Sequence, residues 1–581
     1  MSNKTRLATA ALLGAALVGA AARGDEPRQL MRTPIAELYG APSTLDSASL
    51  SPDGSRVAAI RTSDDGATEL IVRDFARPEP SAILKRPAGG SGLRSCRWKT
   101  DTRLLCSMKD PKNDLTHWLA VNADGTGETN LREFDRILHI LPDQPARVLV
   151  TGPPRVYATF VDVETGKRTP LLGSNDQDGR IADGTGAIRV RPYYQSNSQG
   201  WTFLPAPKSG WVVLHEEALN TEEWFLPLDL DERTDEVLYT HLAADRLALF
   251  AWDGHEQRRV VRAEPVAHVV DVHMVGKPAR AASAVVLDGL VRWEPIDPRV
   301  ASVRDAVQRS YPSALIYVLE EDWNQRHYLV LVSDRQGAGR YYRFEPREGR
   351  LDEVGQTYAN LDDRVSAPRT TLDLSLTVGR PAAAYVTVPE GASGPLPAVV
   401  VPAGTSSWPN NAVPFLVASG FVVIENPAEP LYRGQPFGSS WHAIASEINA
   451  AVRELTRTGT IDAGRVCAVG MGLGAYAALM SAGDSPDLFR CVVGIDTTID
   501  PAVGDRMIAS VKTAASVPVP VLLFSGKGDK SAARLRGTLE GRGTPSVEVV
   551  KYDDTIFERP ATPNRIDLLA RLGEFLTAHL R

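Results

Sequence analysis

The first two thirds of the chain alternate between short apolar runs and polar turns. Between about residues 33 and 362 the runs have strand length, and little of the 3.6-residue periodicity of helices is present. Polar turns recur with similar composition, as in Ser51-Pro52-Asp53-Gly54, Asn122-Ala123-Asp124-Gly125 and Ala182-Asp183-Gly184-Thr185. Repeated strand and turn units predict a β-propeller over residues 33–362, with a repeat too irregular to give the number of blades. A β-sandwich is the alternative, but about 330 residues exceed one sandwich.

After about residue 365 the pattern changes to alternating apolar strands and helices. Strands are expected at residues 398–401, 421–424, 466–469, 491–495, 520–524 and 546–552. Helical periodicity is present at residues 443–457 and 565–580. This alternation predicts a second domain over residues 365–581, built on a doubly wound, mainly parallel sheet.

The N-terminus has the organisation of a secretory signal peptide. Lys4 and Arg6 precede an apolar, alanine-rich run over residues 7–22, and small residues end that run. A retained membrane anchor is the alternative, but the run is short and weakly hydrophobic for crossing a bilayer. We expect residues 1–22 to be removed and the mature chain to be periplasmic or secreted, without stable membrane insertion.

Four cysteines form two local pairs along the chain. Cys96 and Cys106 flank a polar turn between two expected strands, where a disulfide across a hairpin is feasible. Cys467 and Cys491 lie on expected neighbouring parallel strands. Four cysteines allow three connectivities, and four buried free thiols are the alternative if the protein is not exported.

The net charge of −7 gives no general attraction to nucleic acid or to anionic lipid, and neither is an expected partner. The ten histidines are scattered, and no zinc-protease or phosphate-binding loop motif occurs, so no metal or cofactor is expected. His268 and His273 lie five residues apart in a strand-like stretch and are interpreted as structural.

The sequence Gly470-Met471-Gly472-Leu473-Gly474 lies at the expected end of a strand and the beginning of a helix. An α/β-hydrolase carries Gly-x-Ser-x-Gly on such a turn, and the N–H of the residue after the serine contributes to the oxyanion hole. Here Gly472 occupies the nucleophile position and has no hydroxyl, and Leu473 would supply the oxyanion N–H. The same glycines, with Ala475 and Asp496, also fit a dinucleotide-binding fingerprint, although that motif normally opens its domain.

Several segments in the same order resemble the prolyl oligopeptidase family of serine peptidases, including its dipeptidyl-peptidase and acylaminoacyl-peptidase branches. The matching segments are Tyr432-Arg433-Gly434 with Phe437-Gly438, Ile461-Asp462 with Arg465-Val466, Gly474-Ala475-Tyr476, and Pro486-Asp487-Leu488-Phe489. The resemblance covers the whole mature chain. It implies a propeller followed by an α/β-hydrolase domain, with Tyr432 and Arg433 near the substrate.

The departures from the family pattern concern the chemistry. The family's nucleophile falls on Gly472 and its base on Thr555, whereas Asp529 retains the acid position. The sequence Pro402-Ala403-Gly404-Thr405 stands where the family has His-Gly-Gly-Pro near the oxyanion site. A serine mechanism needs a base within hydrogen-bond reach of its nucleophile.

The remaining candidates for a nucleophile or a base are few. From residue 365 onward the histidines are His442 and His579, neither of them in the expected loop, and Cys467 begins its strand rather than the turn. Asp529 has a structural alternative, because a loop aspartate can cap the following helix.

We therefore expect a binding or regulatory pseudo-peptidase that takes a peptide or a small acyl ligand between its domains. The alternatives are an active peptidase or esterase with an unrecognised nucleophile and, more remotely, a dinucleotide-binding protein. A homo-oligomer of the chain is compatible with the sequence.

Overall fold

The computed structural model describes residues 31–581 with gaps. The gaps are residues 64, 88–90, 110–115, 153–157, 172–180, 206–209, 220–224, 244–245, 256–257, 266, 288–290, 334–337, 359–360, 362–366, 368, 376–381, 403–411, 426–436, 498–515, 528 and 554–561. The side chains of residues 109, 437–443 and 473 are also not described. The expected signal peptide lies outside the described residues.

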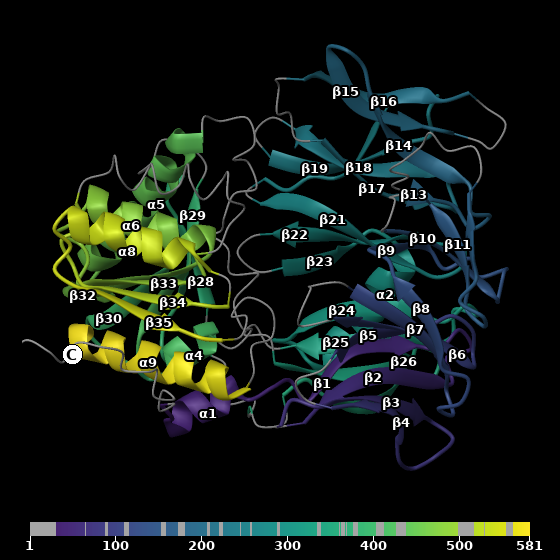
Figure 1. Cartoon of the computed structure of the whole chain (residues 1–581), viewed down its shortest axis with the longest axis horizontal. Helices are drawn as coiled ribbons and strands as arrows, with labels where there is room; N and C mark the ends of the chain where they lie inside the picture. Colours follow the sequence, from purple (N-terminus) through teal and green to yellow (C-terminus); the bar gives the residue numbers. More distant parts are fainter. Residues whose placement is uncertain are drawn as a thin grey trace, which may run out of the picture.

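Within the described residues, the strands up to Gln356 form seven small antiparallel sheets, arranged as the blades of a β-propeller (Figure 1). Blades 1 and 2 contain β1 (Leu45–Leu50), β2 (Arg56–Thr62), β3 (Thr68–Asp74), β4 (Ser81–Arg86), β5 (Gly92–Trp98), β6 (Arg103–Lys109), β7 (Thr116–Asn122) and β8 (Thr129–Glu133). Blades 3 and 4 contain β9 (Arg136–His139), β10 (Arg147–Thr151), β11 (Thr159–Asp162), β12 (Arg168–Pro170), β13 (Ile181–Ala182), β14 (Ile188–Tyr194), β15 (Ser198–Phe203) and β16 (Val212–Ala218). Blades 5 and 6 contain β17 (Phe225–Asp231), β18 (Glu236–Ala243), β19 (Arg246–Trp252), β20 (Arg259–Arg262), β21 (His268–Val275), β22 (Arg280–Leu287) and β23 (Val291–Pro295). Blade 7 contains β24 (Leu315–Glu321), β25 (Tyr328–Ser333), β26 (Gly339–Glu345) and β27 (Arg350–Gln356), and α2 (Pro298–Ser310) precedes it.

Aspartates fix the polar turns that recur along the propeller. The Asp53 carboxylate accepts from the Ser55 N–H at 2.9 Å, and Asp183 accepts from the Thr185 N–H at 2.9 Å. These local bonds explain why Asp and Gly recur between the strands, because an aspartate side chain can replace a backbone acceptor in a tight turn.

Each pair of neighbouring blades shares its own hydrophobic cluster. The first and last blades share no strand, so their apolar contact closes the ring. Leu45, Leu50 and Val57 of blade 1 pack there against Leu329 and Tyr341 of blade 7.

The second domain is built on an eight-stranded sheet in the order β28-β29-β31-β30-β32-β33-β34-β35. Its strands are β28 (Arg369–Asp373), β29 (Ala383–Thr387), β30 (Leu396–Val401), β31 (Val422–Glu425), β32 (Ile461–Met471), β33 (Cys491–Ile495), β34 (Val521–Ser525) and β35 (Val547–Lys551). The pairs from β31 to β35 are parallel, and β28 and β29 add an antiparallel edge. The described helices that follow residue 411 are α4 (Ala412–Ala418), α5 (Phe437–Arg457), α6 (Leu473–Asp484), α8 (Ser531–Gly541) and α9 (Thr562–Leu580).

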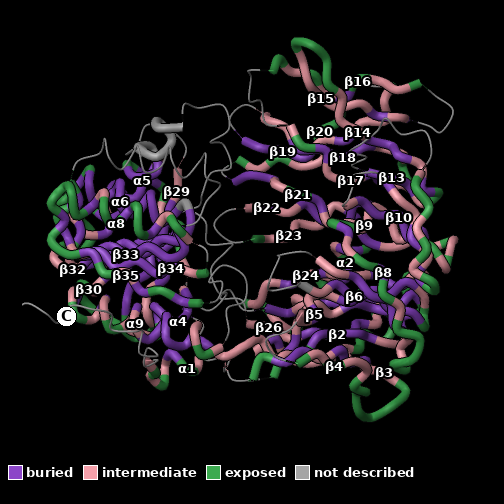
Figure 2. The backbone as a smooth tube through the Cα atoms, viewed as in Figure 1, coloured by how far each residue is buried: buried purple, intermediate pink, exposed green. Residues whose placement is uncertain are grey.

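Helices cover both faces of this sheet, so the central strands are buried on each side (Figure 2). One face packs on α5, α6 and α8, and the other packs on α4 and α9. This double burial explains why these strands read as continuous apolar runs in the sequence.

Helix α1 (Pro34–Gly40) belongs to the second domain although it precedes the propeller in sequence. Ala36 and Tyr39 are buried in the cluster that also contains α9, and Arg565 donates to the Gly40 carbonyl at 2.6 Å. From the sequence, the propeller was expected to begin at residue 33. In the structure, the first strand of its first blade begins at Leu45. After α1, which packs in the second domain, the chain forms the propeller and then the rest of the second domain.

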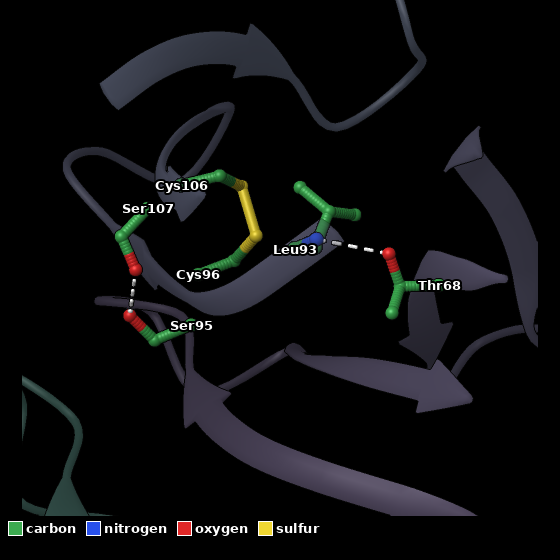
Figure 3. The surroundings of a disulfide bond; sticks show 6 residues. All are labelled: Thr68, Leu93, Ser95, Cys96, Cys106 and Ser107. Atoms are coloured by element: carbon green, nitrogen blue, oxygen red, sulfur yellow. Dashed lines mark hydrogen bonds between the residues drawn. A yellow bond between two sulfur atoms is a disulfide. The ribbon is translucent and has the colours of Figure 1, made fainter. Parts of the chain in front are cut away.

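Two disulfides pair the cysteines as the sequence suggested. Cys96 and Cys106 are directly opposite on β5 and β6, and Ser95 and Ser107 bond beside them at 2.7 Å (Figure 3). Cys467 and Cys491 are register partners on the parallel strands β32 and β33. The expectation of two local pairs is confirmed.

None of the described helices is long and apolar enough to cross a membrane.

Candidate functional site

The turn between β32 and α6 has a backbone conformation that suits glycine. Gly472 has φ 54° and ψ −120°, outside the regions that side-chain-bearing residues ordinarily occupy. Its N–H donates to the carbonyls of Ile495 at 2.9 Å and Asp496 at 3.1 Å, and its own carbonyl accepts from Ala475 N at 3.2 Å. The turn is therefore held by the end of the neighbouring strand β33 and by the first turn of α6.

The glycine spacing of the motif has a steric reason. A Cβ at Gly470 would lie 2.1 Å from the Gly474 carbonyl oxygen and 2.5 Å from Ala475 N. On β33, a Cβ at Gly494 would lie 2.9 Å from the Leu523 side chain and 3.4 Å from Ala475 Cβ. Small residues at these positions therefore allow α6 to pack closely against β32 and β33.

Asp529 follows β34 and lies two residues before the first residue of α8. Its Oδ1 accepts from Ser531 N at 2.7 Å and from Ala532 N at 3.3 Å, and its Oδ2 accepts from the Thr497 hydroxyl at 3.4 Å. The carboxylate thus satisfies free N–H groups at the beginning of α8, as the structural alternative for this residue required.

A buried tyrosine connects this carboxylate to the turn. Tyr476 of α6 is fully buried, and its hydroxyl donates to the Thr497 carbonyl at 3.3 Å. Burial, together with the negative charge of Asp529, raises the pKa of Tyr476 well above its ordinary value. Tyr476 therefore stays neutral and acts as a hydrogen-bond donor here.

Several residues of the expected site lie outside the described residues. These are Tyr432 and Arg433, Thr555, and residues 403–405 of the expected oxyanion segment. Leu473 is the first residue of α6, and its side chain is not described. Of the expected site residues, the structure describes Gly472, the backbone of Leu473 and Asp529. Asp529 is connected to the turn through Thr497 and Tyr476.

The other nucleophile and base candidates are placed as follows. Cys467 is fully buried and bonded to Cys491, so no thiolate is available there. His579 lies in the last turn of α9, where its Nδ1 is 2.8 Å from the Phe575 carbonyl oxygen. The side chain of His442 is not described.

Asp496 directly follows β33 and lies beside the turn, where a dinucleotide-binding site would have its ribose-binding acid. It is only 7% exposed, and its carbonyl is engaged by the Gly472 N–H. A ribose-binding carboxylate must reach its ligand, so this burial disfavours the nucleotide interpretation. Among the described residues, no group of three or more His, Cys, Asp or Glu side chains could hold a metal ion.

Two features near the site were not expected from the sequence. Thr497 is the partner of Asp529, and only the meeting of β33 and β34 at one sheet edge could have suggested it. Glu425 ends β31 as a buried carboxylate paired with Arg369 at 3.1 Å. Burial raises the pKa of Glu425, although the charge of Arg369 opposes that shift.

Comparison with known proteins shows which fold contains a turn of this kind. Residues 442–505, which contain β32, the glycine turn, α6 and β33, match the model of the prolyl oligopeptidase family. The chain has the prolyl oligopeptidase fold. No curated protein matches the sequence.

Solved structures of similar fold cover nearly the whole chain. A puromycin-hydrolysing peptidase of Mycobacterium tuberculosis has a TM-score of 0.64 at 14% identity, with 95% of this chain and 97% of that chain covered. A prolyl endopeptidase has a TM-score of 0.66 at 13% identity, with coverages of 94% and 91%. Prolyl oligopeptidase B of Galerina marginata has a TM-score of 0.64 at 12% identity, with coverages of 94% and 90%.

The β32–α6 turn is a strand-to-helix turn with Gly472 at its centre, which is the shape that a nucleophile elbow has in α/β-hydrolases. Gly472 has no side chain, so this elbow-like turn carries no hydroxyl at its centre.

Proposed function

We propose that the chain is an exported pseudo-peptidase, which binds a peptide or a small acyl group between its two domains and does not hydrolyse it by a Ser-His-Asp mechanism. The observation that carries this proposal is Gly472 at the nucleophile elbow. Without an Oγ, no acyl-enzyme forms at this position.

The parts of the site that serve binding support the same interpretation. The Leu473 N–H lies at the beginning of α6, where helix N–H groups favour an acyl oxygen or another electron-rich group. Among proteins of this fold, the Galerina enzyme has been captured with a 25-residue substrate peptide, so the fold accommodates long peptides.

Asp529 has structural partners that do not depend on a catalytic histidine. It bonds to the first N–H groups of α8 and to Thr497. Its retention is therefore compatible with the loss of catalysis.

Two further observations support export. Both disulfides bridge register-matched strand positions, and structural disulfides persist in oxidising compartments. The N-terminal charge and apolar pattern of residues 1–22 is that of a cleaved signal.

The test is exposure of the purified mature protein to a fluorophosphonate probe, followed by mass spectrometry of any adduct. The puromycin-hydrolysing peptidase serves as the labelled positive control. We expect no adduct on this chain, and an adduct on one specific serine would establish the alternative of an active serine hydrolase with an unrecognised nucleophile.

A second measurement addresses binding. A pool of short synthetic peptides is tested for its effect on the thermal unfolding of the chain, because a ligand of the folded state raises the midpoint. A chain that neither labels nor responds to any peptide would contradict the binding half of the proposal.

A further inference from the structure

The turns that follow the innermost strand of each blade lie at one end of the propeller. The first innermost strand, β1, begins next to α1, which packs on the second domain (Figure 1). At that same end the Thr44 N–H donates to the Thr357 carbonyl at 2.7 Å, where the chain leaves the last blade. The turns after β1 and its equivalents are therefore at the opposite end, away from the second domain, and we call this end the far end.

One part of the far end is acidic. The turns of blades 3, 4 and 5 surround a cavity of about 610 Å³, whose lining includes Asp143, Asp183, Glu232, Asp235 and one cation, Arg189. The side chain of Asp143 is 79% exposed and that of Asp235 is 49% exposed. We call the four carboxylates of this lining the acidic half.

The charge of the acidic half is only partly balanced. Arg189 is buried and bonds to Asp235 at 2.7 Å and to Asp183 at 3.3 Å. Lys277 reaches the rim from blade 6 and pairs with Asp143 at 2.6 Å. Four carboxylates therefore share one arginine and one lysine, and negative charge remains available to a partner at the exposed rim.

The neighbouring part of the far end is basic. Arg233 lies in the turn after β17, Arg299 lies in the first turn of α2, and Arg326 lies in the turn after β24; all three are exposed. The Arg299 guanidinium contacts the Gln325 amide oxygen, which shows that α2 begins beside the far-end turn of blade 7. We call the three arginines the basic half.

Two arginines of the basic half are not neutralised. Arg233 reaches Asp297 at 3.3 Å, and this buried carboxylate is shared with Arg280 at 2.8 Å. In contrast, neither Arg299 nor Arg326 has a carboxylate partner among the residues that the structure describes. The positive charges of Arg299 and Arg326 are therefore also available to a partner.

The two halves lie next to each other on one face, because both are built from far-end turns. Asp53 and Asp101 of blades 1 and 2 lie at the same end, beside Arg56 and outside both halves. A two-fold axis in the plane of the far end places the basic half of one molecule over the acidic half of another. The reverse contact then forms at the same time, as in any isologous interface.

A second copy of the chain fits this face better than a partner of a single charge. An anionic surface would be attracted to the basic half and repelled by the carboxylates beside it, and a cationic partner would meet the reverse. A suitable partner presents both charges in the opposite order. The chain itself does so, and the two-fold arrangement forms that contact twice.

We propose that two copies of the chain associate through their far ends, with the basic half of each against the acidic half of the other. The contact leaves both second domains outside it, because they lie at the opposite end of each propeller. The association and the proposed function are therefore tested separately, and no ligand is needed here.

The test is sedimentation velocity of the purified mature protein at about 50 μM, in about 0.1 M and about 1 M salt. At the lower salt concentration the Debye length of about 10 Å screens the net negative charge of each copy, whereas charges in contact still attract. We expect a dimer there, with a dissociation constant that rises roughly tenfold or more at the higher salt concentration. A monomer at both concentrations would overturn the proposal.

Two charge-reversal variants test the contact itself. Arg299→Glu with Arg326→Glu reverses the basic half. Asp143→Lys with Gln144→Lys reverses the rim of the acidic half and leaves the pair between Arg189 and Asp235 intact. Each variant alone should associate roughly a hundredfold more weakly than the wild type, because both contacts of the dimer then oppose like charges.

The matched control changes charge in the second domain. Arg453 and Arg457 lie on α5, with side chains 55% and 71% exposed. Arg453→Glu with Arg457→Glu makes the same change of net charge as the variant of the basic half. It should dimerise like the wild type, and a monomer would show that net charge, rather than the far-end contact, governs association.

An equimolar mixture of the two far-end variants gives the sharpest result. In a mixed dimer, one contact joins two native halves and the other joins the introduced glutamates to the introduced lysines, so attraction returns at both. We expect native mass spectrometry to show mixed dimers and no dimer of either variant alone. Dimers of a single variant, or no mixed dimer from variants whose circular dichroism and melting match the wild type, would overturn the proposal.

Discussion

A serine in place of Gly472, in the turn between β32 and α6, should destabilise the protein. At φ 54° and ψ −120°, Gly472 occupies a conformation that costs a residue with a side chain about 1–3 kcal/mol. The backbone cannot relax freely, because its N–H is bonded to both Ile495 and Asp496. Gly472→Ser should therefore lower the free energy of unfolding by about 1–3 kcal/mol and the midpoint of the domain by roughly 2–12 °C.

The assay is thermal and urea unfolding of wild type and variant, with Gly537→Ser as the matched control. Gly537 lies within α8 with nothing within 4 Å of an added Cβ, so serine there should be neutral or slightly stabilising. Equal stability of Gly472→Ser and the wild type would refute the strain argument. We also expect Gly472→Ser alone to resist the fluorophosphonate probe, because Thr555 supplies no base.

Three other outcomes are expected. Burial raises the pKa of Asp229 to about 6 and that of Glu320 to about 7, so their protonated forms favour folding and this contribution is lost as the pH rises through those values. Asp229→Asn and Glu320→Gln should therefore gain stability relative to the wild type between mildly acidic and mildly alkaline pH, whereas parallel melting curves would contradict the assignment. Asp529→Ala should cost about 1 kcal/mol through loss of the helix cap, measured by urea unfolding, and Asp529→Asn should recover part of it. Replacing Cys467 and Cys491 by alanine should cost about 3–4 kcal/mol, given their separation of 24 residues, and an unchanged melting point would show that the pair is not formed in solution.

Strand positions in the second domain could be predicted closely because burial on both faces makes each strand a continuous apolar run. The expected strand at 491–495 coincides with β33, and the strand expected at 466–469 lies within β32. The number of blades was beyond the sequence because the blades differ in strand length: β13 has two residues and β18 has eight. A repeat whose units vary in this way leaves no fixed period to count.

The site was only partly predictable, because some of its contacts are local in sequence and others join distant segments. The elbow is local, and its glycines follow from a close approach within five residues. Thr497 meets Asp529 across 32 residues, and Lys277 meets Asp143 across 134. Such pairs depend on which turns the fold brings to one end, and hydrophobic periodicity carries no information about that.

On the proposed function, the expected acid position at Asp529 and the expected nucleophile position at Gly472 carry unequal information about activity. In an active triad, the acid orients a histidine, and once the histidine is gone that role ends. Asp529 also has a structural role, because it accepts from the first N–H groups of α8 and from the Thr497 hydroxyl. The Thr497 carbonyl in turn accepts from the buried Tyr476 hydroxyl. A carboxylate with such a structural role is retained with or without catalysis, so Asp529 gives no support to hydrolysis. A serine at the elbow has no such second role and carries a strain that glycine does not. If the proposed function holds and hydrolysis is not required, stability alone favours glycine at position 472.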